Sequence, residues 1–142
     1  MKQSVPLGIL RIASALIFLP AGTSKLINWP MAAPMNPAPG SQIYIGAWIE
    51  AVGGLLLLLG LCTRPVAFLL SGTMAVAYWQ YHALEALKDK PGQPALPIHS
   101  VIVPSMNGGV AAAIFCFVFL YLTMTGGGAM SLDAKLGAKK SG

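Results

Sequence analysis

Apolar residues fill four long stretches of the chain, separated by polar or helix-breaking segments. The stretches run from about residue 7 to 27, 43 to 61, 65 to 84 and 108 to 125. A helix that crosses the apolar core of a bilayer needs about 20 consecutive, mostly apolar residues, and each stretch is close to that length. The pattern predicts an all-α fold, a polytopic membrane protein in which residues 1–142 form one domain with a bundle of four transmembrane helices.

The connecting segments differ in length and in proline content. Residues 28–41 and residues 88–104 each contain four prolines. Because proline lacks the backbone N–H and clashes with the preceding helical turn, neither segment is expected to be helical throughout. The second and third stretches are joined only by Cys62 to Pro65, and proline suits the first position of a helix. These two helices are expected to form a tight hairpin.

Composition and charge support a membrane location and indicate an orientation. Of the 142 residues, 56% are hydrophobic and only 9% are charged, which is unusual for a soluble domain. Lysine and arginine are concentrated on the side that holds both termini and the hairpin: Lys2, Arg64 and the basic tail of residues 131–142, against Lys25, Lys88 and Lys90 on the other side. Short loops rich in these residues stay in the cytoplasm, so both termini are expected there. The net charge of +5 then suits anionic lipid head groups, and no nucleic-acid partner is expected.

The first apolar stretch has a second interpretation, a cleavable signal peptide, because Lys2 precedes it and Ala21 and Gly22 are small. Arg11 argues against this interpretation. It would interrupt the apolar core of a signal peptide, whereas in a membrane helix its long side chain can extend to the interface. An uncleaved span is therefore expected.

Four residues are expected at the membrane boundaries. Arginine extends its charge toward head groups, and tryptophan is enriched at both interfaces. The four are Arg11 and Arg64 on the cytoplasmic side and Trp29 and Trp48 on the opposite side.

Motifs for metals, cofactors or catalysis are absent from the sequence. It contains no CxxC, CxxCH, HExxH, phosphate loop or dinucleotide fingerprint, and no cluster with metal-ligand spacing. Cys62 and Cys116 are expected at different membrane depths, too far apart for a disulfide. We expect no metal and no intrinsic cofactor.

Polar residues within the apolar stretches are the candidate site, because ionisable groups are costly in a bilayer. Helical spacing places five of them in the outer half of the bundle: Lys25, Glu50, Tyr78, His82 and Asn107. They are candidates for a ligand pocket. Alternatively, Lys25 extends to the interface or forms an ion pair with Glu50 that fixes helix register, and His82 is solvated at the interface. Four small residues are expected to permit close helix packing: Gly22, Gly46, Gly53 and Gly54.

Several runs, in this order, resemble the DoxX-like family of small four-helix membrane proteins. They are LRIA at residues 10–13, IFLPAGTSKL at 17–26, EAVGGL at 50–55, GLCTRP at 60–65, MAVAY at 74–78 followed by His82, NGG at 107–109 and SLD at 131–133. The resemblance covers nearly the whole chain and implies a bacterial cytoplasmic (inner) membrane protein. The family is related to the membrane component of thiosulfate:quinone oxidoreductase, which implies a role beside other membrane or redox subunits.

The chain departs from the family pattern at two places. The family commonly has a glutamate where Val110 stands and a tyrosine near Phe115 and Cys116. Loss of that glutamate makes intrinsic catalysis less expected, so the protein would be at most a quinone-interacting subunit of an oxidoreductase.

Three classes of function remain open. The first is a subunit of a larger respiratory or sulfur-oxidising complex that lines a quinone-accessible groove near Glu50, Tyr78 and His82. The second is a structural accessory subunit that packs through its glycines. The third is a small-solute transporter with Glu50 as a proton-linked gate.

Overall fold

The computed structural model describes residues 4–140, with side chains up to residue 137. Lys2 lies outside the described residues, as do the side chains of Lys139 and Lys140 at the end of the basic tail. Within the described part the chain forms helices and no β-strand, which confirms the all-α prediction. In chain order the elements are α1 (Val5–Ile27), α2 (Gln42–Leu59), α3 (Thr63–Ala77), the π-helix η1 (Tyr78–Ala83), the 3₁₀-helices η2 (Glu85–Leu87) and η3 (Ile98–Ile102), α4 (Pro104–Asn107), α5 (Val110–Thr125) and α6 (Leu132–Lys140).

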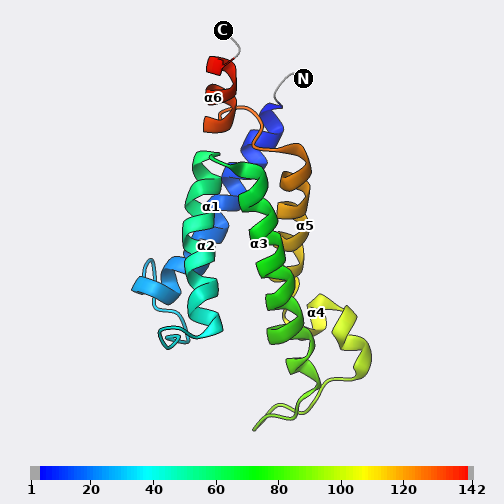
Figure 1. Cartoon of the computed structure of the whole chain (residues 1–142). Helices are drawn as coiled ribbons and strands as arrows, with labels where there is room; N and C mark the ends of the chain where they lie inside the picture. Colours follow the sequence, from blue (N-terminus) through cyan, green and yellow to red (C-terminus); the bar gives the residue numbers. More distant parts are fainter. Residues whose placement is uncertain (1–3, 141–142) are drawn as a thin grey trace.

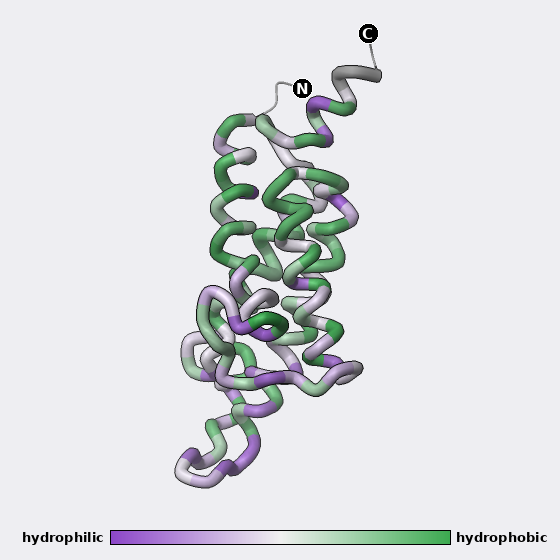
Figure 2. Tube along the Cα trace, turned by 90° about the vertical axis from the view of Figure 1, so that its left-hand side faces the viewer, coloured by the Kyte–Doolittle hydropathy of each residue, from purple (hydrophilic) through white to green (hydrophobic). Residues whose placement is uncertain are grey.

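The long helices pack as two antiparallel pairs. α1 packs mainly on α2, and α3 mainly on α5, while α2 and α3 join the pairs (Figure 1). Both ends of the chain lie at the same end of the bundle, beside α6 and the α2–α3 turn (Figure 1). We call this the terminal end and the opposite one the loop end. Apolar positions concentrate along the helices, and hydrophilic ones gather in the loops and in α6 (Figure 2).

Two helices, rather than four, are by themselves long and apolar enough to cross a membrane: α1 with 23 residues and α2 with 18, among the described residues. The third apolar stretch forms α3 for 15 residues and then changes to the π-helix η1. The fourth yields the 16-residue α5, because Gly108 has φ +76 and ends α4 before α5 begins. Local backbone changes therefore shorten the third and fourth regular helices.

The helix ends follow from short-range capping. The hydroxyls of Ser4 and Ser41 accept hydrogen bonds from the backbone N–H groups of Leu7 and Tyr44 at the starts of α1 and α2. Gly60, with φ +69, ends α2 in the left-handed conformation. Because α3 already begins at Thr63, the turn is shorter than expected and Pro65 is the third helical residue rather than the first.

The core consists of buried apolar side chains from all four long helices. Phe18 contacts Phe119 edge-on with ring centroids 4.9 Å apart, and Phe115 packs beside both. α1 and α2 approach closely at Gly22, where an added Cβ would lie 2.7 Å from the carbonyl oxygen of Ala47. Close backbone packing of this kind is what associates helices where water does not drive burial.

Candidate functional site

Arg11 is fully buried at the terminal end, where its guanidinium binds backbone carbonyls. Nε donates to the Gly127 oxygen at 2.9 Å, Nη2 to the Met130 oxygen at 3.2 Å, and Nη1 to the oxygens of Leu57 and Leu58. The carbonyl end of a helix carries partial negative charge, so the positive charge of Arg11 interacts favourably with the end of α2. The expectation that Arg11 extends to the interface is corrected: carbonyls at the end of α2 and in the loop after α5 bind it inside the protein.

Asp133, in the first turn of α6, caps the start of α3. Its two carboxylate oxygens accept hydrogen bonds from the N–H groups of Cys62 and Thr63, both at 2.8 Å. Burial would raise the pKa of this carboxyl, but the hydrogen bonds from Thr63 and Cys62 and the nearby Arg11 charge outweigh burial and lower the pKa. Sequence reasoning assigned Asp133 no role, because the helix that it caps begins 70 residues earlier.

Glycines let this polar network close. A Cβ on Gly60 would lie 2.8 Å from the Ser131 Cα and 2.9 Å from the Arg11 Cζ, and one on Gly127 would lie 2.7 Å from the Thr63 Oγ1. The Ser131 hydroxyl donates to the Gly128 oxygen at 2.9 Å. The loop between α5 and α6 is thereby held against α2 and α3.

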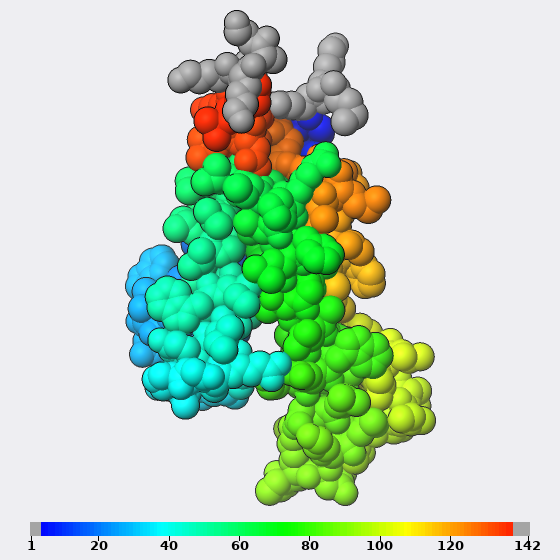
Figure 3. Space-filling model, in the orientation of Figure 1, coloured from blue at the N-terminus to red at the C-terminus, as the bar shows by residue number. Residues whose placement is uncertain are grey.

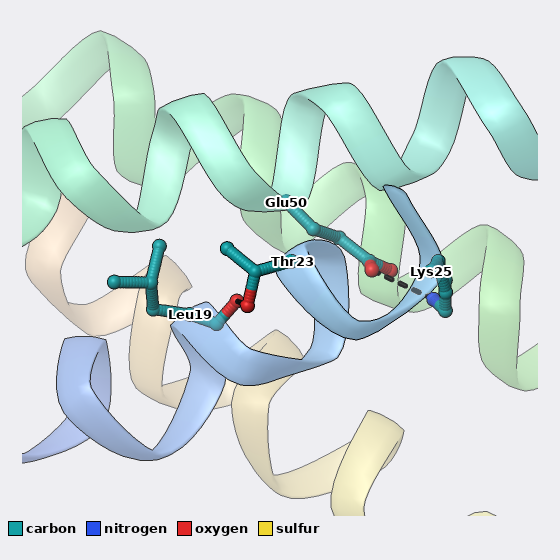
Figure 4. A network of polar contacts seen from close by, with 4 residues as sticks. All are labelled: Leu19, Thr23, Lys25 and Glu50. Carbon is teal, nitrogen blue, oxygen red and sulfur yellow. Dashed lines mark hydrogen bonds and ion pairs between the residues drawn. The ribbon is translucent and has the colours of Figure 1, made fainter. Parts of the chain in front are cut away.

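At the loop end of α1 and α2, Lys25 and Glu50 form an ion pair. The Lys25 Nζ donates to the Glu50 Oε2 at 2.7 Å (Figure 4). Glu50 is only 5% exposed, whereas Lys25 is half-buried. Figure 4 also shows the Thr23 hydroxyl bonded to the Leu19 carbonyl of its own helix, so it does not add to the pair. The pair gives the buried carboxylate of α2 a partner on α1, and removal of either side chain would leave the other without its partner.

Tyr78 and Asn107 form a second polar group, between η1 and the segment that leads into α5. The Tyr78 hydroxyl donates to the Val101 oxygen at 2.8 Å and accepts from the Asn107 Nδ2 at 3.2 Å. Asn107 also donates to the Ser100 oxygen at 2.9 Å, and its Oδ1 accepts from the Gly109 N–H at 2.8 Å. Their hydrogen-bonding groups are thus used within the protein.

His82 forms no hydrogen bond or ion pair with either group among the described residues, but it lines the same pocket as Asn107. It is half-buried and lines a pocket of about 480 Å³ together with Glu85, Lys88 and Lys90. Hydrogen bonds from Lys88 and Lys90 lower the pKa of the exposed Glu85 carboxyl, and in the described part of the chain no three His, Cys, Asp or Glu residues cluster as metal ligands.

The five candidate residues therefore fall into two groups, the Lys25–Glu50 pair and a second group in which Asn107 is bonded to Tyr78 and shares a pocket with His82. Within residues 4–140 no hydrogen bond or ion pair joins the Lys25–Glu50 pair to Tyr78, His82 or Asn107. The pair belongs to α1 and α2, and the others belong to the α3–α5 side. A single pocket was expected because helical spacing gives the depth of a residue but not the neighbouring helix.

Of the four glycines named for packing, three lie in helix contacts. Besides Gly22, a Cβ on Gly53 would lie 2.8 Å from Leu70, and one on Gly54 would lie 3.2 Å from Leu19. Gly46 differs, because a Cβ there would meet nothing within 4 Å.

Gly46 lines a groove of about 560 Å³ between α2 and α3, which we call the α2–α3 groove. An opening between these helices is visible in Figure 3. The Gln42 Nε2 donates to the Gln80 Oε1 at 2.7 Å near its end, while Gly72 and Thr73 line the α3 wall. The walls are mainly apolar, and the groove was not evident from the sequence because it lies between helices.

The boundary residues lie on the surface, except for Arg11. Trp29 and Trp48 are exposed toward the loop end, and Arg64 is exposed beside the α2–α3 turn at the terminal end.

Comparison with known proteins gives the family. The DoxX family model matches residues 7–83, which contain α1, α2, α3 and η1. The chain belongs to the DoxX family, a family of membrane proteins. An uncharacterized protein of Haemophilus influenzae is 36% identical over 131 residues, 91% of this chain and 89% of that protein. The inner membrane protein YphA of Escherichia coli K12 is 31% identical over 139 residues, 94% of this chain and 91% of that protein. No solved structure matches. Asn107 and the loop that binds Arg11 lie beyond the stretch matched by the DoxX model.

Proposed function

We propose that this DoxX protein crosses the bacterial inner membrane four times and is a non-catalytic subunit of a larger membrane complex. One observation carries the proposal. Arg11 and Glu50, which are buried, and Tyr78, which is half-buried, bind backbone groups or another side chain. Large apolar side chains cover the outside, among them Ile17, Phe68 and Phe117. Polar groups that are hydrogen-bonded within the protein hold the helices together, and they are not free to bind or react with a substrate.

The four spans follow from adding the short elements to the regular helices. α3 and η1 follow each other without a break, and their 15 and 6 residues cover about 30 Å at about 1.5 Å per residue. α5 has 16 residues and is shorter, about 24 Å by the same rise. Local thinning of the bilayer or shielding by a partner accommodates such a helix.

The proposed location and orientation have separate support. The relative named inner membrane protein supports the bacterial inner membrane. Arg64 and Lys135 lie at the terminal end, and cytoplasmic loops are rich in such residues, so both termini are placed in the cytoplasm. A cysteine-labelling scan that found residue 135 outside the cell would overturn this orientation.

The α2–α3 groove is the proposed partner contact. Gly46 on one wall and Gly72 on the other both face open space, so an apolar helix can approach the backbone there. A redox complex is the setting that we propose, with other membrane subunits as partners.

A quinone in the same groove is a second candidate, favoured by its chemistry. The mostly apolar walls suit an isoprenoid tail, and Gln42 lines the groove. Its NH₂ group donates one N–H to Gln80 and has a second N–H to donate to a quinone oxygen. No quinone is needed for the first proposal.

The test is native mass spectrometry after gentle extraction from the native membrane, with Gly46→Leu as the variant and Ala111→Leu on the exposed face of α5 as the matched control. Gly46→Leu fills open space without a clash. We expect it to release partner subunits, or quinone, that the wild type and Ala111→Leu retain. A wild-type protein that carries neither subunit nor quinone would contradict the proposal, and solute uptake in proteoliposomes would favour a transporter instead.

A further inference from the structure

A second groove, of about 730 Å³, lies at the terminal end, between the start of α3, the end of α5 and the glycine loop of residues 126–128. We call it the terminal groove. The start of α3 and the segment after α5 adjoin at this end of the molecule (Figure 3). None of the candidate residues for a ligand pocket lines it.

One wall of the terminal groove has an unsatisfied polar group. Thr63 is 1% exposed, and its Oγ1 has no hydrogen-bond partner among the described residues. The hydroxyl lies near enough to Asp133 to help lower the pKa of that carboxyl, yet it makes no hydrogen bond of normal geometry with it. A buried hydroxyl without a partner is costly, so an acceptor atom that reached it from the groove would be favoured.

The same wall carries a cation. Arg64 is exposed in the groove and forms no ion pair within residues 4–140. Its Nε lies 3.4 Å from the position of a Cβ on Gly126, so the guanidinium lies over the glycine loop. Asp133 also lines the groove, but both of its oxygens accept backbone hydrogen bonds and its charge lies near that of Arg11. The guanidinium of Arg64 is therefore available to an anion.

The other wall is apolar and continues onto the outer surface of α5. It includes Leu7, Pro65, Tyr121 and Met124, and the last two are 52% and 74% exposed. The groove thus joins a cation and a buried hydroxyl to an apolar surface at one end of a membrane helix bundle. A molecule with an anionic head and an apolar chain complements both walls.

We propose that the terminal groove binds a membrane phospholipid. Arg64 and Thr63 bind its phosphodiester group, and Tyr121 and Met124 contact the upper part of an acyl chain. Arginine matches phosphate through paired N–H donors, and the threonine hydroxyl supplies a third. The assignment rests on the proposed four-span arrangement, which places this end of the bundle at the level of the head groups.

The test uses the full chain in nanodiscs of phosphatidylcholine with a minor fraction of phosphatidylglycerol. Lipids retained after transfer to detergent are counted by native mass spectrometry. We expect the wild type to retain a phospholipid and Arg64→Gln to bind it roughly tenfold more weakly, because hydrogen bonds from a charged donor are lost. Lys135→Gln removes a charge from the same end, outside the groove, and is expected to retain the lipid. Equal retention by the wild type and Arg64→Gln would overturn the proposal.

Thr63→Val separates ligand binding from stability. It removes the unpartnered hydroxyl while keeping the shape of the side chain. In delipidated protein we expect an unchanged or higher melting temperature, together with weaker lipid retention. A variant that is less stable without lipid but retains it normally would contradict the assigned role.

Inorganic phosphate distinguishes a lipid from a soluble anion. We expect phosphatidylglycerol to raise the melting temperature of the wild type, and phosphate to do no more than chloride at equal ionic strength. Equal stabilisation by phosphate would overturn the lipid assignment. Lipid retention without any co-purifying subunit would refute the proposed complex and leave this site standing, so the two proposals fail separately.

Discussion

The two ends of the bundle are held together differently. At the terminal end, polar contacts join segments that are distant in the sequence: Arg11 binds a carbonyl 116 residues away, and Asp133 caps a helix 70 residues away. At the loop end the contacts are more local, since Lys25 and Glu50 are 25 residues apart and Asn107 and Ser100 are 7 apart. The buried long-range contacts tie both helix pairs to the segment after α5, whereas at the loop end the α2–α3 groove lies between the pairs and an exposed Gln42–Gln80 bond joins them.

The largest expected effect comes from Arg11→Met, which removes every hydrogen bond of the guanidinium, including those to the carbonyls of Leu58, Gly127 and Met130. We expect a loss of about 2–4 kcal/mol in the free energy of unfolding, because several buried groups lose partners at once. Thermal unfolding in detergent measures this effect. Arg11→Lys is the control, since it keeps the positive charge but lacks the planar guanidinium with its several N–H donors. It should lose less stability than Arg11→Met. A melting temperature unchanged by Arg11→Met would show that the terminal end is not the stabilising one.

Asp133→Ala is expected to cost about 1–2 kcal/mol, because the start of α3 loses its cap. The wild type should also depend on pH. The pKa of Asp133 is lowered in the folded state from its ordinary value of 3.8, so its contribution is full above that value and disappears as the pH falls through the lower folded pKa. Melting curves recorded from pH 6 down to about pH 3 measure the difference in stability between wild type and variant. A difference that grew toward low pH would contradict the assignment.

The same contrast explains what sequence can predict. Hydropathy predicts where helices lie, with the regular helices and η1 beginning and ending within two residues of the expected ranges. Periodicity also placed Lys25 and Glu50 at compatible depths, because their contact joins consecutive helices. These properties depend on neighbours along the chain.

Long-range contacts were not predictable from local pattern. From the sequence alone, a buried Arg11 cannot be told apart from an arginine at the interface. Its acceptors are backbone carbonyls, which every residue type has, so they leave no pattern in the sequence. Asp133 gave no capping pattern beside α3, because the helix that it caps begins 70 residues earlier in the chain.

The ion pair at the loop end provides a finer test. A double-mutant cycle with Glu50→Gln and Lys25→Met is expected to give a coupling of about 1 kcal/mol, smaller than the loss at Arg11, because Lys25 is half-exposed. If Glu50→Gln lowers the melting temperature and leaves bound partners or quinone unchanged, the residue is structural. Loss of complex activity in a well-folded variant would instead give Glu50 a functional role.

The smallest effect is expected at Gln42, whose amide bond to Gln80 joins the helix pairs at an exposed position of the loop end. Gln42→Met should change the free energy of unfolding by about 0.5 kcal/mol or less, since exposed amides exchange protein for water partners. The same substitution should widen the groove, which is measurable as faster labelling of Thr73→Cys on its wall by a thiol reagent. Thr125→Cys, on the terminal side of α5, is the matched control and should be labelled equally fast with either residue at position 42. A large loss of stability, with labelling of Thr73→Cys unchanged, would show that this contact stabilises the loop end strongly without closing the groove, which would contradict the expectation.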